Sequence, residues 1–303
     1  MKSLKSYLNG FKAAINTKKL VTLLYSTTLL LTLVIAIPFG KTIENKAGYS
    51  GAIHNLLYNY DYTIYSDFMN QYSDAIQPFI STAVWIAVLY LIFTVFFTGG
   101  ILKILKMNEA SYFLSSFWKA CAQYFSRFFR LAVYMIILHV ILAIIVFLLL
   151  SMILDSAYNT VQSEASLFYI ALAGVIIYLI FFIYLLAVTD YAKIMMFKYP
   201  EYRPLRTVVR AFAFVTKHLF STFGLYKLLL VFPIILFIVY FIISSAIGMS
   251  NGFLILLTFI IQQIVIWFRV FTKVWFLGSE MDLFDTFDNK QQEEIIAEAV
   301  PAN

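Results

Sequence analysis

The chain has 303 residues, of which 62% are hydrophobic and 13% are charged. With so few charged residues, the chain has too little polar surface for a soluble domain of this length. The composition therefore excludes an ordinary globular protein and indicates a membrane protein. The formal net charge of +6 does not indicate a nucleic-acid partner, because the bases border apolar segments, where they set orientation and contact anionic lipid headgroups. Cys121 is the only cysteine, which excludes an intrachain disulfide and a thiol-based metal site.

Six apolar runs divide the chain. Each has about 20 residues or slightly more, enough for a helix to cross a hydrocarbon core of about 30 Å. The first run is too long for the apolar part of a signal peptide and is not followed by a cleavage site of small residues, so we expect it to remain as an anchor. The sequence therefore predicts an all-α, polytopic integral membrane protein with six transmembrane helices. The runs are Leu20–Phe39, Phe79–Thr98, Leu131–Leu154, Leu167–Val188, Leu228–Ile247 and Phe253–Trp275.

Positive charge divides unequally between the gaps that separate these runs. If the N-terminus is cytoplasmic, seventeen bases lie on the inner side, whereas only Lys41 and Lys46 lie in the outer loops. Such an asymmetry predicts the cytoplasmic membrane as the location, with the N-terminus and the C-terminus both inside. The inner bases are Lys2, Lys5, Lys12, Lys18, Lys19, Lys103, Lys106, Lys119, Arg127, Arg130, Lys193, Lys198, Arg203, Arg206, Arg210, Lys217 and Lys227.

A short pattern recurs before the first, third and fifth runs, where an apolar residue, a base and an alanine follow one another. The pattern reads Phe11-Lys12-Ala13, Trp118-Lys119-Ala120 and Val209-Arg210-Ala211. It indicates three copies of one hairpin unit, made of an interfacial helix, a span, an outer loop and a second span. The predicted membrane domain, residues 1–278, then contains hairpins at about 1–107, 108–200 and 201–278, followed by an acidic cytoplasmic tail at 279–303. The alternative is coincidence, because any membrane helix tends to end in a base at the inner face.

Helical periodicity supports the interfacial helices, which we call elbows. Phe113, Phe117, Cys121, Tyr124 and Phe128 fall on one face at helical spacing, with bases opposite. Leu205, Val208, Val209, Phe212 and Leu219 make a second stripe, and Pro204 suits the first turn of that helix. An elbow could sense lipid or dock a partner; we favour the alternative, a structural helix that packs under the bundle. The basic elbow residues are Lys12, Lys119, Arg127, Arg130, Arg206, Arg210 and Lys217.

Polar residues inside the predicted spans are candidate functional groups, since unpaired polar groups in hydrocarbon are costly. His139, Gln262 and Gln263 fall near the bilayer midplane. They could line a substrate path, or they could join helices by hydrogen bonds to one another or to backbone carbonyls, which is the more common role. Near the inner face, Asp190 and Arg269 could form an ion pair that staples or gates two helices.

The long outer loop, residues 40–78, combines Asp61, Asp67 and Asp74 with several tyrosines. Tyr65, Phe68, Tyr72 and Ile76 are spaced as one helix face. Carboxylates and tyrosines could bind a cation or a sugar, but tyrosines anchored at the headgroups and solvated acids are the more usual arrangement.

No signature of catalysis occurs in the sequence, which lacks a zinc-protease helix, a nucleophile elbow and a phosphate-binding glycine loop. We therefore expect no enzyme activity, no cofactor and no metal site. The acidic tail is expected to be disordered or frayed at its end, and its acids could cover the elbows or hold a protein partner.

The Thr98-Gly99-Gly100 exit after the second run and the elbow at Ser115–Arg130 complete a pattern that resembles bacterial integral-membrane families of unassigned role. They are similar to the YciC-type proteins and to the membrane domain fused to some glycerophosphodiester phosphodiesterases. The resemblance covers about residues 1–280 and implies the six-helix fold. The phosphodiesterase activity does not carry over, because the chain has no such soluble domain.

Together these patterns predict a non-enzymatic protein with a lipid-facing accessory or scaffold role. Its expected partners are membrane lipids with anionic headgroups. The alternative function is a small transporter or permease for a lipid or hydrophobic solute, with the midplane polar residues as its path.

Overall fold

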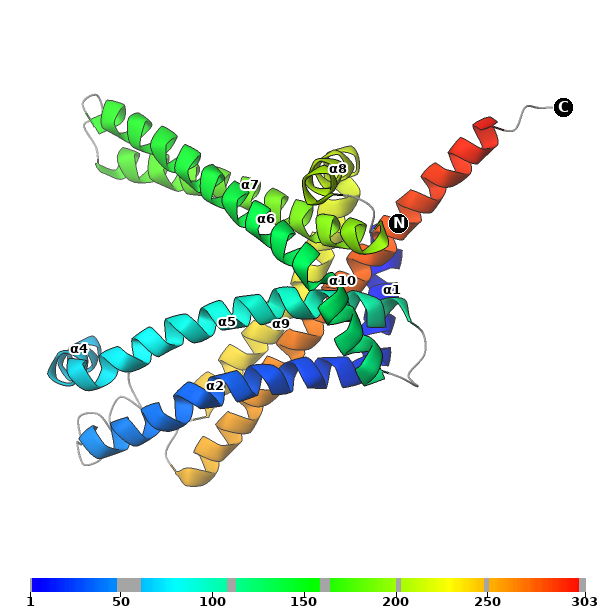
Figure 1. The fold of residues 1–303 in the computed structure, drawn as a ribbon. Helices are drawn as coiled ribbons and strands as arrows, with labels where there is room; N and C mark the ends of the chain where they lie inside the picture. Colours follow the sequence, from blue (N-terminus) through cyan, green and yellow to red (C-terminus); the bar gives the residue numbers. More distant parts are fainter. Residues whose placement is uncertain are drawn as a thin grey trace. The chain divides into compact units, whose positions relative to one another are not determined.

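A computed structural model describes residues 2–47, 61–107, 113–158, 164–199, 203–247 and 251–299. Within these ranges all the regular structure is α-helical (Figure 1). The helices are α1 (Lys2–Asn16), α2 (Lys18–Ala47), α4 (Tyr62–Gln71), α5 (Ser73–Lys106), α6 (Phe113–Tyr158), α7 (Glu164–Lys198), α8 (Pro204–Lys217), α9 (Leu219–Ala246) and α10 (Gly252–Ala299).

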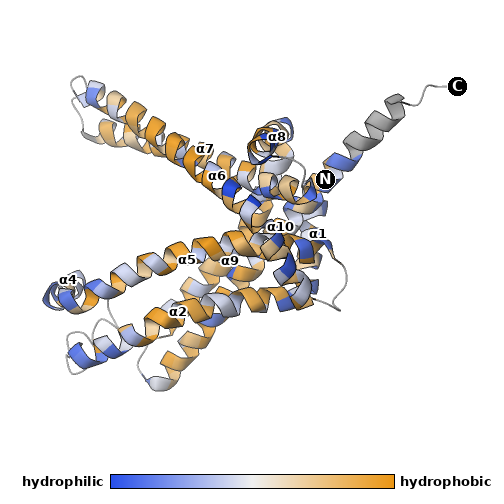
Figure 2. Cartoon of the chain, viewed as in Figure 1, coloured by the Kyte–Doolittle hydropathy of each residue, from blue (hydrophilic) through white to orange (hydrophobic). Residues whose placement is uncertain are grey.

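Six of these helices, α2, α5, α6, α7, α9 and α10, are long and apolar enough to cross a membrane. Their middle parts are mainly apolar, whereas α8 carries many hydrophilic residues (Figure 2). Large side chains on them are exposed, for example Ile144 at 53% and Phe147 at 71%. Exposing such large apolar surfaces to water is unfavourable, whereas hydrocarbon solvates them. Within hydrocarbon, a helix also satisfies its own backbone hydrogen bonds. The predicted all-α class is confirmed for the described residues, and six helices that could cross a membrane agree with the prediction of a multi-pass membrane protein.

The chain divides into two compact units. The first unit contains Met1–Ser6, Val95–Leu225 and Ser279–Asn303. The second contains Tyr7–Thr94 and Tyr226–Gly278. In the first unit α6 packs along α7, and α8 contacts both of them.

Two glycines in the first unit bring α5 close to α6. A Cβ atom added to Gly100 would lie 2.5 Å from the ring of Phe117 and 2.6 Å from the sulfur of Cys121. At Gly99 it would lie 2.9 Å from the carbonyl oxygen of Ala120. Phe117 and Cys121 are fully buried. The predicted stripe on this segment therefore packs against protein, because glycine lets the facing helix approach within the space of a side chain.

The predicted second elbow is the first part of α6 and continues without a break into the span. No Gly or Pro occurs between Phe113 and Tyr158, so nothing interrupts the helix at Arg130. The segment predicted as the third elbow is a separate helix, α8, which begins at Pro204 as predicted and ends before the non-helical His218. The first, α1, is separated from α2 by Thr17.

The outer-loop stripe is split between two helices. Tyr65 and Phe68 belong to α4, Tyr72 ends that helix, and Ile76 lies in α5. Asp61 is the N-cap of α4, where its carboxylate accepts hydrogen bonds from the backbone of Thr63 at 2.8 Å and Ile64 at 3.3 Å. One of the three loop carboxylates thus has a structural role.

The acidic tail was expected to be disordered or frayed at its end, but α10 continues through most of it, to Ala299. Its first turns belong to the first unit, where Leu283 and Phe284 are buried. Apolar residues among the acids give this segment a face to pack, which the count of charges alone conceals.

We expect Gly100→Ala to destabilise the protein by about 1–3 kcal/mol, the usual cost of overpacking a filled site. Gly40→Ala is the matched control, because nothing lies within 4 Å of the added methyl group and alanine favours a helix in both places. Thermal unfolding in detergent measures both variants. Equal unfolding temperatures for the two would contradict the close approach of α5 and α6.

Candidate functional site

His139 lies on α6 in the first unit and is partly buried. Its Nδ1 atom is 2.7 Å from the carbonyl oxygen of Met135, one turn earlier. A carbonyl only accepts, so this hydrogen bond requires the tautomer with the proton on Nδ1. The edge of the ring meets Phe182 of α7, with 5.2 Å between ring centroids. His139 is thus held within the α6–α7 pair by its own helix and by an aromatic contact.

The two glutamines belong to the second unit and bond to two different helices. Gln262 Nε2 donates to the hydroxyl of Tyr240 on α9 at 3.3 Å, and the hydroxyl of Tyr25 on α2 donates to Gln263 Oε1 at 2.9 Å. Adjacent helical residues point about 100° apart, which explains why the pair reaches two neighbours. The sequence suggested that the glutamines bond to one another or to backbone carbonyls. Their partners in the structure are instead the hydroxyls of Tyr240 and Tyr25.

Asp190 forms an ion pair with Lys193 of its own helix, with 2.7 Å between Oδ1 and Nζ. Arg269 belongs to the second unit, so the expected pair between Asp190 and Arg269 stays a prediction. Beside Lys193 lies Glu280 of α10, a buried carboxylate that sequence reasoning missed. Its neighbour Ser279 is also fully buried, so the first turn of the predicted tail lies inside the first unit.

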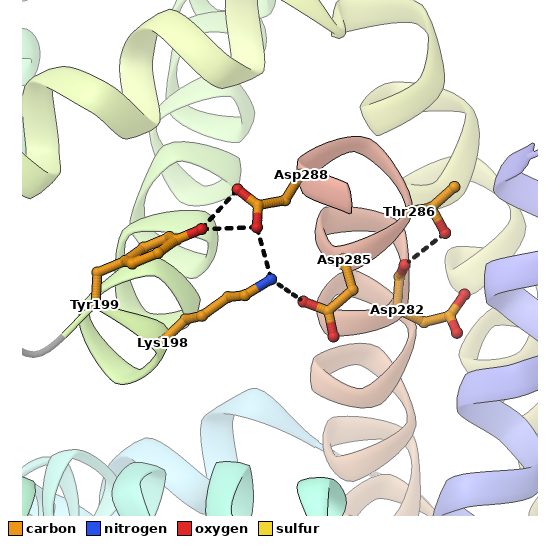
Figure 3. Close-up of polar contacts among 6 residues, drawn as sticks. All are labelled: Lys198, Tyr199, Asp282, Asp285, Thr286 and Asp288. Carbon is orange, nitrogen blue, oxygen red and sulfur yellow. Dashed lines mark hydrogen bonds and ion pairs between the residues drawn. The ribbon is translucent and has the colours of Figure 1, made fainter. Parts of the chain in front are cut away.

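A second polar cluster joins the end of α7 to α10 (Figure 3). Lys198 Nζ lies between Asp285 Oδ1 at 3.0 Å and Asp288 Oδ2 at 2.7 Å. The hydroxyl of Tyr199 donates to the same Asp288 carboxylate at 2.7 Å. We call these four residues the clasp. Its charge-assisted hydrogen bonds fix the acidic segment to α7, because each carboxylate neutralises part of the Lys198 charge.

A third contact of the acidic segment involves Phe287. The ring of His218, at the end of α8, stacks on Phe287 with 3.9 Å between centroids, and Lys2 Nζ lies 4.2 Å from the same ring. Burial and the charges of Lys217 and Lys2 lower the pKa of His218 below its ordinary value of 6.5. A neutral imidazole is therefore favoured where the chain start, α8 and α10 meet.

The predicted basic residues of the elbows lie mainly on exposed surfaces. Arg127 is the exception and is half-buried in α6. Arg130 Nε donates to the carbonyl of Ser126 at 3.2 Å, a contact within its own helix. The exposed residues are Lys12, Lys119, Arg130, Arg206, Arg210 and Lys217.

The second unit contains a cavity of about 520 Å³. Its walls come from α2, α5 and α10, and we call it the three-helix cavity. Two of the residues that line it, Arg269 and Lys273, are cationic, and no described lining residue is acidic. The lining residues are Thr28, Leu31, Thr32, Ala83, Ile86, Ala87, Tyr90, Ile266, Arg269, Val270 and Lys273.

The sequence indicated Arg269 but not the cavity, and it placed the acids of the clasp in a tail that could cover the elbows or hold a protein partner. A signal for the clasp was present, because Asp285 and Asp288 are one helical turn apart beside Phe284 and Phe287. That spacing predicts one face that is both acidic and apolar. The cavity forms only where three helices meet, and a local sequence pattern does not predict which helices meet.

Comparison with protein-family models, curated proteins and solved structures gives no match. Among the described residues, no three His, Cys, Asp or Glu side chains lie close enough together to hold a metal ion.

We expect Asp288→Asn to loosen the acidic segment more than Asp285→Asn. Asp288 is the more buried acid, with 17% of its side chain exposed against 46%, and it contacts both Lys198 and Tyr199. Loss of its charge should cost about 1 kcal/mol locally. Hydrogen exchange of residues 283–289 measures the loosening, and Asp285→Asn is the matched control. The same exchange rate in both variants would show that Asp288 does not hold the segment.

Proposed function

We propose that this chain is a non-enzymatic, lipid-facing accessory or scaffold protein of the cytoplasmic membrane. Both termini lie on the cytoplasmic side, three hairpins cross the bilayer, and the elbows rest on anionic headgroups at the inner face. The unequal distribution of bases supports the orientation, and the six apolar helices support the membrane location.

The surface of α8 carries this proposal. One face, formed by Thr207, Val208, Ala211 and Val215, is buried against protein. Beside it, Leu205 is 60% exposed. Val209, one turn further, is 68% exposed.

Arg206 and Arg210 point about 100° away from those two residues around the helix and are also exposed. A buried face, an exposed apolar face and a basic face thus follow one another. A helix with exposed apolar and basic faces side by side fits the boundary between hydrocarbon and headgroups.

The attachment of α8 to α7 supports a fixed elbow. Thr216 Oγ1 donates to the carbonyl of Phe212 at 2.8 Å, so its proton is used within α8. The hydroxyl of Tyr184 on α7, 2.8 Å from Thr216 Oγ1, must then be the donor in their hydrogen bond. Phe212 also meets the Tyr184 ring, with 5.8 Å between centroids. The bases of such an anchored helix each contribute roughly 1 kcal/mol near an anionic surface.

The alternative function, a transporter or permease for a lipid or hydrophobic solute, is favoured by the three-helix cavity. The hydrogen bonds of Gln262 and Gln263 favour the scaffold, because each glutamine joins α10 to a different helix and acts as packing glue. The aromatic contact of His139 with α7 favours the same role.

Fluorescence quenching tests the placement of α8. Single cysteines at Val209→Cys and Arg210→Cys are labelled with one fluorophore, in vesicles whose acyl chains carry bromine. The native Cys121 is fully buried and stays unlabelled in the folded protein. We expect stronger quenching at position 209, since its side faces the acyl chains, and weaker quenching at its neighbour 210. Equal and weak quenching at both positions would place α8 in water and overturn the proposal.

A further inference from the structure

Each wall of the three-helix cavity is one helix face. The lining residues of α10 are Ile266, Arg269, Val270 and Lys273, at the spacing of a single helical stripe. Those of α5 and α2 follow the same rule, as Ala83, Ile86, Ala87 and Tyr90 and as Thr28, Leu31 and Thr32. Regular faces of three helices therefore line the space, which is partly open, and its volume of about 520 Å³ falls within the range of small-molecule sites.

The charged and the apolar lining residues of the cavity lie on different helices. Its cations come from α10, whereas α2 and α5 contribute alanines, aliphatic side chains, threonines and one tyrosine. The threonine hydroxyls are used within α2, since Thr28 donates to the carbonyl of Leu24 at 3.0 Å and Thr32 to that of Thr28 at 2.9 Å. The walls opposite α10 are thus mainly apolar, and a ligand must combine an anionic group with a hydrocarbon part.

The two cations are one turn apart on the same face of α10. Two bases at this spacing lie on one side of the helix, so a single anion can contact both of them. Arg269 can offer a planar pair of donors to phosphate oxygens, and Lys273 can add a point charge. An intramembrane cation is in itself a candidate functional group.

The depth of the cations matches the level of a phospholipid headgroup. Lys273 lies two residues, and Arg269 six residues, before the predicted end of the sixth span at Trp275. At 1.5 Å per residue these positions are about 3 Å and 9 Å inside the hydrocarbon boundary. Their long side chains can reach a phosphate at that boundary.

We propose that the three-helix cavity binds one phospholipid with an anionic headgroup. Its phosphate contacts Arg269 and Lys273, and part of an acyl chain lies along α2 and α5. In this proposal the anionic partner of Arg269 is a lipid phosphate, whereas the sequence suggested Asp190. It rests on the membrane placement proposed above and is independent of the elbows.

Photochemical labelling tests this site. The full-length protein in mixed micelles is exposed to phosphatidylglycerol that carries a diazirine in its acyl chain, and mass spectrometry locates the labelled peptides. We expect labels at residues 28–32 and 83–90, with about tenfold less labelling from a phosphatidylcholine probe. Its phosphate is the same, but its choline cation is repelled by Arg269 and Lys273. Unlabelled phosphatidylglycerol should compete, and inorganic phosphate should not.

Substitutions test separately whether lipid binding needs the two bases and whether it needs the empty volume of the cavity. Arg269→Gln with Lys273→Gln should reduce labelling of the cavity about tenfold. Ala87→Phe should abolish it by filling the cavity while both bases remain. The control, Lys41→Gln with Lys46→Gln, also removes two bases of the second unit, both exposed and outside the cavity, and should leave labelling unchanged.

The results distinguish this inference from the proposed function. Equal cavity labelling by both lipids, competition by inorganic phosphate, or full labelling of the double Gln variant would overturn the lipid site. If a variant fails to fold, the two lipid probes and the two competitors on the wild-type protein still test the lipid site. Labels on α8 are read from the same digests, and their absence with both probes would count against the elbows, whatever happens in the cavity.

Discussion

The hydrocarbon core of a bilayer cannot hydrogen-bond to a protein, and the rest of this structure depends on that constraint. Helices satisfy it for the backbone, which explains why six long helices can expose residues such as Phe147 on their surfaces. Apolar side chains facing lipid supply no hydrophobic force that would hold helices together. Close packing must do so instead. Just beyond the predicted second span, Gly99 and Gly100 allow such packing where α5 meets the first part of α6.

The same constraint explains where the polar side chains go. Within the spans, Gln262 and Gln263 form hydrogen bonds with tyrosines of neighbouring helices. Beyond the predicted spans they form clusters, and the clasp holds the acidic segment to the end of α7 (Figure 3). The exposed faces of α8 and the cations of the three-helix cavity both offer charge beside apolar surface. Both proposals therefore concern lipids.

Local patterns in the sequence predicted the parts of the fold that depend on local forces. Run lengths predicted the six spans, and Pro204 predicted the start of α8. Features that depend on distant segments were missed. The burial of Glu280, the partners of Asp285 and Asp288, and the cavity each require helices far apart in the sequence to meet. The tail was misjudged because its acids obscured the apolar face around Leu283 and Phe284.

The proposed orientation in the membrane decides which lipids the predicted elbows and the cavity cations meet. Cysteine accessibility in intact cells tests it, with an impermeant thiol reagent and single cysteines at Asn59, Asn159 and Asn289. The first two positions lie outside the described residues, and Asn289 is exposed in α10. We expect reaction at 59 and 159 in intact cells and at 289 only after permeabilisation. Reaction at 289 in intact cells, or protection at 59 and 159, would contradict it.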